Sequence, residues 1–444
     1  MKKANLIVCV VMVATMLLPA CGGGTVATQP PAGATQPSGQ KVNLVYWSMW
    51  NKTEPQAIAL TSIIGKFEAA NPNITIEAVW NGRENQTKVR TALGSNTPID
   101  LADQDEDQIA GGLVLQGMAL PLDDILNAPA LGEDVLLKDL FYPGMVDLFS
   151  KDGVHYLLPY ADQPVMFIYN KAIFTAAGIA APPATWDEFL ADAQKIKDAG
   201  YVPIASEGDV ADYAMFYFTY LVERMAGKGF LLNAIMDKTG QAWLDPTFLQ
   251  AMTMVRELWD KGFIPPESVG YQWPAGQQTL ATGIAAMELC GSWLPEELNP
   301  LVAPDFKWGG FPFPAVAGGT GSIDDLQQWQ FAFIILKNSA HPKEAGLFLK
   351  FLMTKESQAE FSSGATYGVT RPGVDWPKDI VDSEAASASA KVVFTHADGG
   401  TALYPEFTNN VLFANYLNAY IGQMTPAEFV QKMADDSKAY WANK

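Results

Sequence analysis

The sequence predicts an α/β protein with helix-covered parallel sheets, built as two lobes. Short β-branched and aromatic runs alternate with helical patterns from Val42 onward, which is typical of parallel sheets. The chain has 444 residues, enough to build two hydrophobic cores. Of its three cysteines only Cys290 falls within the globular part, so we expect no disulfide there and a fold that depends on its cores.

The first α/β units follow one another directly after residue 40. Leu60, Ile63, Ile64 and Phe67 have helical spacing, and Asn71-Pro72 ends that helix. Strands are predicted on either side of it and further along, at Val42–Trp47, Ile74–Trp80 and Ile99–Ala102, with a second helix near Asn85–Leu93. Ligands of such sheets bind beyond the carboxyl ends of the strands, so the loops after Trp47, Trp80 and Ala102 are the expected site.

The later part of the chain repeats this alternation. Asp152-Gly153 predicts a hairpin turn, and the apolar run Val165–Tyr169 begins a second α/β unit. Thr185 and Glu188 form a capping box at the start of a helix that Gly200 is placed to end. Two further helices are expected to begin at Pro342 and at Thr425-Pro426.

Residues 1–20 have the pattern of a signal peptide. Lys2 and Lys3 precede the apolar run Leu6–Leu18, which is too short for a helix to cross a hydrocarbon core of ~30 Å. The run ends in Leu18-Pro19-Ala20-Cys21, which resembles a bacterial lipobox and predicts lipidation of Cys21. Residues 22–40 carry no charge and predict a flexible tether. We therefore expect an exported protein, lipid-anchored on the outer face of the cytoplasmic membrane; a secretion signal followed by a chance cysteine is the alternative.

The charge of the chain excludes several classes of partner. Asp and Glu number 48 against 29 Lys and Arg, a formal net charge of −19. Such a surface repels polyphosphate, so nucleic-acid binding is not expected. No basic amphipathic segment predicts binding to a membrane surface, which leaves the lipid anchor as the only expected membrane contact.

No metal site or cofactor is expected either. The three histidines lie too far apart for metal-ligand spacing. Asp103, Asp105 and Asp107 have the spacing of an EF-hand start, but Gln108 stands where glycine is required and Val114 where the bidentate acid belongs. Capping of the following helix needs only one of these acids, so another is free to face a ligand.

Several blocks of sequence carry a family resemblance. Tyr169-Asn170-Lys171 and the following IFTAAGIAAPPATWDEFLADAQKIK resemble the family 1 extracellular solute-binding proteins, a group that includes maltose-binding protein. The blocks GRENQTKVRTALGSNTPID, GIAAMELCGSW and AHPKEAGLFLKFLMTKESQAEF are similar to that family in the same order. The resemblance covers roughly residues 42–444 and rests on the order of the blocks together.

The resemblance implies a two-lobed periplasmic-binding-protein fold with three hinge crossings, each lobe a mainly parallel sheet flanked by helices. The crossings are expected near 159–162, 311–314 and 366–371. The N-terminal lobe would then comprise 41–160 plus 313–366, and the C-terminal lobe 161–312 plus 367–444. The implied function is capture of a mono- or oligosaccharide by cleft closure and its delivery to the membrane subunits of an ABC importer, by a monomer without catalytic activity or cofactor.

Candidate ligand contacts follow from the chemistry of sugars, which present apolar faces and hydroxyl rims to aromatic rings and to carboxylate or amide groups. Trp50 follows the first strand, while Trp47 fits the core better. Asn81 and Arg83 follow the second strand, although Arg83 also fits a solvated surface. Asp103 and Asp105 follow the third.

The resemblance supplies the remaining candidates. It implies that Trp293 of the Gly291-Ser292-Trp293 block stacks on the sugar, with Ser292 beside it; packing at a helix start is the alternative for Trp293. Aromatic residues after Val202–Ala205 point to Tyr213 and Phe216, though several aromatics of that helix must pack inward. The crossings suggest the further candidates Asp162, Asp324, Trp329, Tyr367 and Arg371.

Two other functions remain open. A glycosidase needs two carboxylates flanking the scissile bond, and no motif singles out such a pair. A binder of a non-sugar solute, such as a polyamine, a metal chelate or a polyol phosphate, is the other alternative. Phosphate recognition would require several cations in the cleft, and only Arg83 and Arg371 are obvious.

Overall fold

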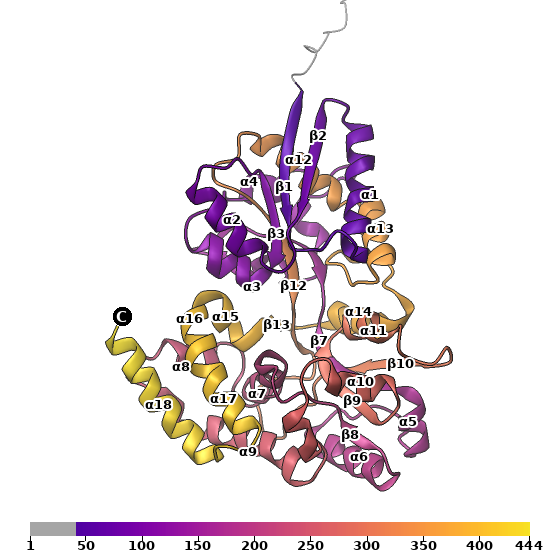
Figure 1. The fold of residues 1–444 in the computed structure, drawn as a ribbon, viewed down its shortest axis with the longest axis vertical. Helices are drawn as coiled ribbons and strands as arrows, with labels where there is room; N and C mark the ends of the chain where they lie inside the picture. The colour runs from indigo at the N-terminus through magenta and orange to yellow at the C-terminus, as the bar shows by residue number, and fades with distance from the viewer. Residues whose placement is uncertain (1–40) are drawn as a thin grey trace, which may run out of the picture. The chain divides into compact units, whose positions relative to one another are not determined.

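Two β-sheets organise residues 41–444, the part of the chain that the computed structural model describes (Figure 1). The signal peptide, the lipidated Cys21 and the tether predicted for residues 1–40 lie outside these residues. Within residues 41–444, every helix is too short or too polar to span a membrane.

The sheet of the N-terminal lobe has five strands in the order β2-β1-β3-β12-β6. They are β1 (Val42–Ser48), β2 (Ile74–Trp80), β3 (Leu101–Asp105), β6 (Leu158–Asp162) and β12 (Gln330–Ile335). β1 pairs in parallel with β2 and β3, whereas β12 runs antiparallel to both of its neighbours. The helices of this lobe are α1 (Pro55–Ala70), α2 (Asn85–Gly94), α3 (Glu106–Ile109), α4 (Asp123–Leu126), α12 (Pro342–Leu352) and α13 (Lys355–Ala365).

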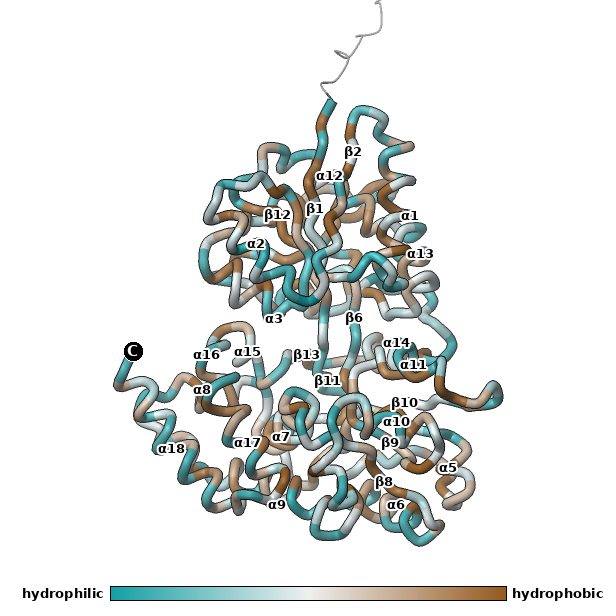
Figure 2. Tube along the Cα trace, viewed as in Figure 1, coloured by the Kyte–Doolittle hydropathy of each residue, from teal (hydrophilic) through white to brown (hydrophobic). Residues whose placement is uncertain are grey.

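Helices cover both faces of this sheet because its strands alternate their side chains. Leu44 and Tyr46 belong to the core cluster that contains the apolar face of α1, whereas Trp47 packs against the cluster around Val89 of α2. The predicted helix stripe is confirmed, since Leu60, Ile63, Ile64 and Phe67 are all buried. Figure 2 shows hydrophobic segments along the strands and inner helices, with hydrophilic loops between them.

The sheet of the C-terminal lobe has the order β13-β11-β7-β9-β8, with β10 also beside β7. The strands are β7 (Val165–Asn170), β8 (Val202–Ile204), β9 (Ala285–Gly291), β10 (Trp308–Phe311), β11 (Asp325–Gln327) and β13 (Val392–Phe394). Its helices are α5 (Lys171–Ala176), α6 (Trp186–Asp198), α7 (Ala211–Ala226), α8 (Phe230–Met236), α9 (Pro246–Asp260), α10 (Ala275–Ala281), α11 (Leu294–Leu298), α14 (Val381–Ser389), α15 (Gly400–Leu403), α16 (Pro405–Phe407), α17 (Ala414–Tyr420) and α18 (Pro426–Ala442). The predicted capping box is present at the start of α6, and α18 begins at the predicted Thr425-Pro426 with a capping box of its own.

The two sheets are mixed rather than parallel, because each contains one reversed strand. β7 runs antiparallel to β9, β10 and β11, as β12 does to β3 and β6. Both reversed strands are the first to follow a crossing between the lobes. The carboxyl edges of the two sheets face each other. A strand that enters a sheet from its carboxyl edge must run antiparallel to the strands of that sheet.

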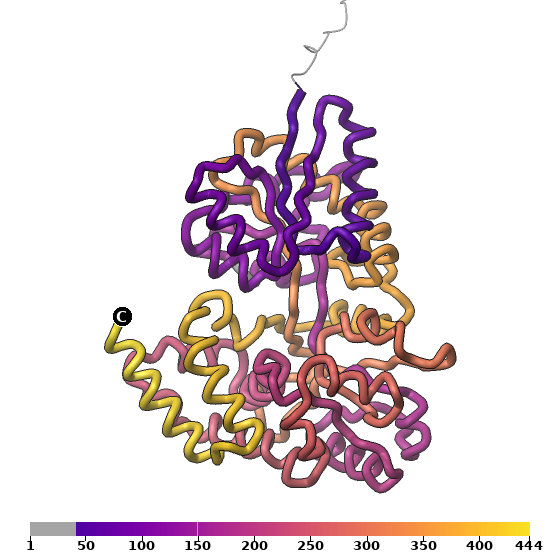
Figure 3. The backbone as a smooth tube through the Cα atoms, in the orientation of Figure 1, coloured from indigo at the N-terminus to yellow at the C-terminus, as the bar shows by residue number. Residues whose placement is uncertain are grey.

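The first crossing connects β6 to β7, near the predicted 159–162. The second crossing was predicted at 311–314, and that position is wrong. β11 pairs with β7 and β13, so the chain stays in the C-terminal lobe through Gln327 and crosses at Gln328-Trp329 (Figure 3). The aromatic and proline residues at 311–314 belong to a core, where Phe313 stacks on Tyr220 with ring centroids 4.8 Å apart.

The third crossing also lies further along the chain than predicted. Val369 forms a bridge to Ala161, and the Thr370 hydroxyl donates to the Pro159 carbonyl oxygen at 2.9 Å. Arg371 bonds to the Met353 carbonyl oxygen, also in the N-terminal lobe. The chain therefore leaves this lobe after Arg371, so residues 161–162, 313–327 and 367–371 change sides relative to the predicted lobe boundaries.

Candidate functional site

A cavity of about 170 Å³ lies where the carboxyl ends of the two sheets face each other. It is smaller than the roughly 300–1,000 Å³ of sites for drug-sized ligands, and suits one ring-sized group. Both lobes and the second crossing supply its lining: Met49, Trp50, Arg83, Asp105, Tyr213, Trp293, Glu297, Trp329, Phe331 and Tyr367.

Trp50 forms the wall of the N-terminal lobe and is held by a chain of hydrogen bonds. Its indole Nε1 donates to the Tyr160 hydroxyl at 2.8 Å, and that hydroxyl donates to Asp103 Oδ2 at 2.8 Å. Asp103 Oδ1 accepts from the Met49 backbone N–H at 3.2 Å. Burial raises the pKa of Asp103 to about 6. Asp103, predicted to contact ligand, instead supports Trp50 from behind.

Arg83 lies against the same wall. Its guanidinium carbon is 4.8 Å from the centroid of the Trp50 ring, within cation–π range. The guanidinium donates to both Glu54 oxygens at 3.0 and 3.1 Å and to the Met49 carbonyl oxygen at 3.0 Å. Asn81 donates its amide to Asn85 Oδ1 at 2.8 Å and does not line the cavity. Asn81 therefore organises the loop that carries Arg83.

Asp105 joins the cavity to the second crossing. Its Oδ1 accepts from the indole Nε1 of Trp329 at 2.8 Å. Burial raises the pKa of Asp105, while the Trp329 bond and the charge of Arg83 oppose that rise. The last residue of β3 is thus bonded directly to the hinge.

Trp293 forms the wall of the C-terminal lobe. Its indole Nε1 is 3.3 Å from the Tyr213 hydroxyl, and its ring lies edge-on to Trp329 with centroids 5.7 Å apart. A Cβ at Gly291 would overlap the Trp293 ring, so glycine is required there for the ring to fold back over the end of β9. The hydroxyl of Ser292 bonds to Gln163 Oε1 of the first crossing. The small residues therefore make room for Trp293 and for the hinge, not for a ligand.

Glu297 stands one helical turn after Trp293, at the mouth of the cavity. The residue is exposed, yet the surrounding cleft removes enough water to raise the pKa of its carboxyl to about 7. The carboxylates of Glu296 and Glu207 add to this rise, while the Gln277 amide, which donates to Glu297 at 3.2 Å, and Arg83 oppose it.

Two further predicted residues are buried next to the cavity without lining it. Phe216 is fully buried and packs between Tyr213, Trp329 and His396. Asp162 is fully buried at the first crossing, where its Oδ2 accepts from the Ser387 hydroxyl at 2.9 Å. Neither residue borders the cavity, so we assign both positions to packing or to the hinge.

The structure places two predicted residues away from the cavity. Asp324 pairs with Lys391 at 2.5 Å, beside β11 and β13. Arg371 forms an ion pair with Glu133 at 2.6 Å in the N-terminal lobe. Asp324 and Arg371 became candidates because they lie near the predicted second and third crossings. Both crossings lie elsewhere, which explains why neither residue is at the cavity.

Six of the thirteen predicted ligand contacts line the cavity: Trp50, Arg83, Asp105, Tyr213, Trp293 and Trp329. Tyr367, a further candidate, lines it as well. Three lining residues were missed. Met49 lies between two tryptophans considered as candidates, and Glu297 lies four residues after Trp293 on α11, so helical spacing could have identified it. Phe331 belongs to the reversed strand β12, which the order of the sequence did not reveal.

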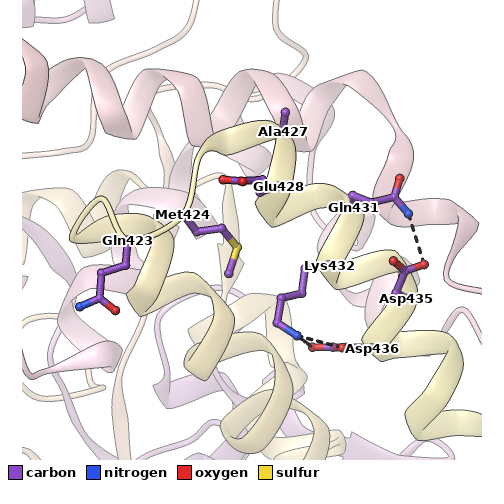
Figure 4. Close-up of a pocket in the computed structure, with 8 residues that line it drawn as sticks. All are labelled: Gln423, Met424, Ala427, Glu428, Gln431, Lys432, Asp435 and Asp436. Carbon is purple, nitrogen blue, oxygen red and sulfur yellow. Dashed lines mark hydrogen bonds and ion pairs between the residues drawn. The ribbon is translucent and has the colours of Figure 1, made fainter.

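Larger hollows elsewhere have a different character. One of about 740 Å³ runs along α18, where Lys432 pairs with Asp436 at 2.9 Å and Gln431 bonds to Asp435 at 3.2 Å (Figure 4). Its polar groups bond to each other within one helix rather than converging on a space. Among residues 41–444, no three His, Cys, Asp or Glu side chains are grouped to hold a metal ion.

Comparisons with known proteins agree with this geometry. A binding protein of Brucella abortus (strain 2308) is 30% identical over 310 residues, covering 67% of this chain and 68% of that protein. An ABC transporter extracellular-binding protein of Pyrococcus horikoshii is 26% identical over 346 residues, covering 76% and 74%. A solved chitin oligosaccharide binding protein superposes with a TM-score of 0.72 at 26% identity, covering 91% of this chain and 100% of that one. The sequence model of the bacterial extracellular solute-binding proteins matches residues 51–359, and the chain belongs to that family.

Proposed function

We propose that this protein captures a carbohydrate in the cleft between its lobes and delivers it to the membrane subunits of an ABC importer. The observation that carries the proposal is the cavity between the sheets, which the fully buried Trp50 of one lobe and Trp293 of the other both line. Aromatic rings accept the apolar faces of sugars, and Asp105 and Glu297 offer acceptors to hydroxyl groups.

Capture operates through closure of the cleft. A ligand shifts the balance between open and closed forms only by as much as its affinity for those forms differs, so it must touch both lobes. Trp329 lies at the second crossing and contacts Trp293 on one side and Asp105 on the other. A sugar placed among these three residues therefore acts on the hinge itself.

The comparisons support binding without chemistry. The family comprises extracellular solute-binding proteins, and the solved relative at 26% identity is named for binding chitin oligosaccharide. The Pyrococcus relative is named as the binding protein of an ABC transporter. We propose that this chain likewise binds the sugar and that a separate permease transports it across the membrane.

The anchoring of the protein is part of the proposal. An extracellular family implies export, and the lipobox-like Leu18–Cys21 supports attachment through a lipid on Cys21. Residues 22–40 would then tether a monomeric binding unit close to the permease. Labelling of cells with a radioactive fatty acid tests this point, because Cys21→Ser should abolish the label and release the protein.

A thermal-shift screen of the purified protein tests the proposed ligand class. The panel contains mono- and oligosaccharides, polyamines and polyol phosphates. A ligand at one hundred times its Kd stabilises the native state by about 2.7 kcal/mol, which gives a clear shift. We expect a saccharide to give the largest shift and to be recovered unchanged. A shift by a polyamine or polyol phosphate alone would contradict the sugar assignment, and turnover of the sugar would contradict binding without chemistry.

A further inference from the structure

We propose that the cleft selects its saccharide by charge, favouring one that carries a protonated amine and excluding those with carboxylate or phosphate groups. This inference rests on the proposed function, since it concerns the class of sugar that the same cavity holds. It follows from how the charged side chains around the cavity are paired.

The one basic group at the cavity is already neutralised. Of the described residues that line it, only Arg83 is basic. Both of its terminal nitrogens bond to the Glu54 carboxylate, and its guanidinium plane lies against Trp50. An anionic sugar would have to displace Glu54 from a bidentate pair to use this cation.

The acids of the C-terminal lobe have no bidentate partner of this kind, although the charge of Arg83 also acts on Glu297. Glu297 at the cavity has only the neutral amide of Gln277 as a hydrogen-bond partner among the described side chains. Glu288 of β9 is 3% exposed, and neither of its carboxyl oxygens has a partner among the described residues. The charges of Glu207 and Glu297 act on Glu288 and raise its pKa further. A positively charged group bound next to Glu297 would offset the negative charge of these neighbouring carboxyl groups.

Acids of the two lobes also act on one another around Asp105, which bonds to Trp329. Asp105 and Asp107 belong to the N-terminal lobe, and Asp212 begins α7 of the C-terminal lobe. Burial and the charges of Asp105 and Asp212 together raise the pKa of Asp107 to about 7. Closing the cleft on an anion would add a like charge to this group, whereas closing it on an ammonium group would offset it.

Calorimetric titration with three matched disaccharides tests the proposal. The probes are β-1,4-linked glucosamine disaccharide, its N-acetylated form and the corresponding glucuronate-containing disaccharide. We expect the amine form to bind at least tenfold more tightly than the N-acetylated form, and the carboxylate form to show no measurable binding. The preference should shrink when NaCl is raised from about 50 to about 500 mM, because salt screens charge.

A matched pair of variants locates the source of the preference. Glu297→Gln should reduce the preference for the amine, measured as the ratio of the two Kd values, to less than threefold, and the affinity for the N-acetylated form is measured alongside as the reference for that ratio. Asp435→Asn, which removes the same charge from the exposed face of α18 (Figure 4), should change neither value. Equal or tighter binding of the carboxylate form, or a preference that persists in Glu297→Gln, would overturn the proposal.

The remaining outcomes separate this proposal from the proposed function. If neutral sugars bind as well as the amine form, charge selection is wrong while sugar capture stands. If none of the three probes binds but another saccharide in the thermal-shift panel does, the amine preference is also wrong. If no saccharide of either panel binds, the proposed function itself fails.

Discussion

Trp329 connects the ligand cavity to the hinge at the scale of a single residue. Its ring contacts Trp293 and His396, with centroids 5.7 and 5.5 Å away, and its indole N–H donates to Asp105. Trp329 lines the cavity, lies at a crossing and binds an acid of the N-terminal lobe. It therefore couples contact with a ligand to the relative position of the lobes.

Replacing Trp329 by phenylalanine tests that coupling. Trp329→Phe keeps an aromatic ring but leaves Asp105 Oδ1 without its donor, and a hydrogen bond to a charged group contributes about 1.5–3 kcal/mol. We expect sugar affinity to fall at least tenfold in a calorimetric titration. Trp441→Phe is the control, because it also removes an indole N–H bond, to Ile235 at 3.1 Å, but lies on α18 outside the cavity. Equal losses in both variants would contradict the assignment.

The sequence pointed to residues at the cavity where an aromatic or acidic side chain lies at or just after a strand end. Trp50, Asp105 and Trp293 are of this kind, and all line the cavity. Asp103 and Ser292 do not line the cavity, because a position in the sequence does not reveal which way a side chain points. Asp103 points back to the Met49 N–H, and Ser292 points to Gln163.

At the scale of elements, the hinge depends on a buried carboxyl group. Asp162 ends β6, and burial raises its pKa well above the usual range. The Ser387 hydroxyl donates to Asp162 Oδ2. The Gln328 amide nitrogen, in the orientation that satisfies both groups, lies 2.6 and 3.1 Å from the two Asp162 oxygens. One side chain thus bonds to the second crossing and to α14.

Two substitutions at Asp162 should behave differently. Asn has the same shape and can still bond to Ser387 and Gln328, so Asp162→Asn should change the free energy of unfolding by less than about 1 kcal/mol. Asp162→Ala removes both bonds and leaves buried polar groups unsatisfied, which should cost about 1–3 kcal/mol. Urea denaturation measures both values. Severe destabilisation by Asn together with tolerance of Ala would show that the group is charged or does not hold the hinge.

Element prediction succeeded where periodicity is local and failed where pairing is long-range. The α1 stripe and the capping box of α6 depend on residues three or four positions apart, and they were found. The reversed direction of β7 and β12 depends on which edge of a sheet the chain enters, which a linear sequence does not encode locally. The misplaced second crossing has the same cause, since β11 was not identified as a strand of the C-terminal lobe.

At the scale of the whole molecule, an excess of acids should make stability depend on pH. The pKa of Asp103 is raised to about 6, and those of Asp107 and Glu297 to about 7, from ordinary values of 3.8 to 4.5. The native state therefore binds more protons than the unfolded state between about pH 4 and pH 7, so stability falls as pH rises through this window. Below about pH 4, acids whose pKa is lowered in the native state, such as Glu54 and Asp123, become protonated and lose their charged interactions. Stability therefore falls there as pH decreases.

Scanning calorimetry of the ligand-free protein checks this expectation. The Tm should be about 2–5 °C higher at about pH 5.5 than at about pH 8. Asp107→Asn should reduce the difference, because it removes one of the acids whose pKa is raised. A Tm that rises steadily from about pH 5.5 to about pH 8, with or without the substitution, would contradict the assigned pKa directions.

The central claim is that a saccharide is held between Trp50 of one lobe and Trp293 of the other. Calorimetric titration with the saccharide that stabilises the protein most tests it directly, using the unaltered protein, Trp293→Ala and Trp441→Ala. We predict one binding site, at least a tenfold loss of affinity in Trp293→Ala, corresponding to about 1.4 kcal/mol or more, and an unchanged affinity in Trp441→Ala. Undiminished binding by Trp293→Ala would contradict the account.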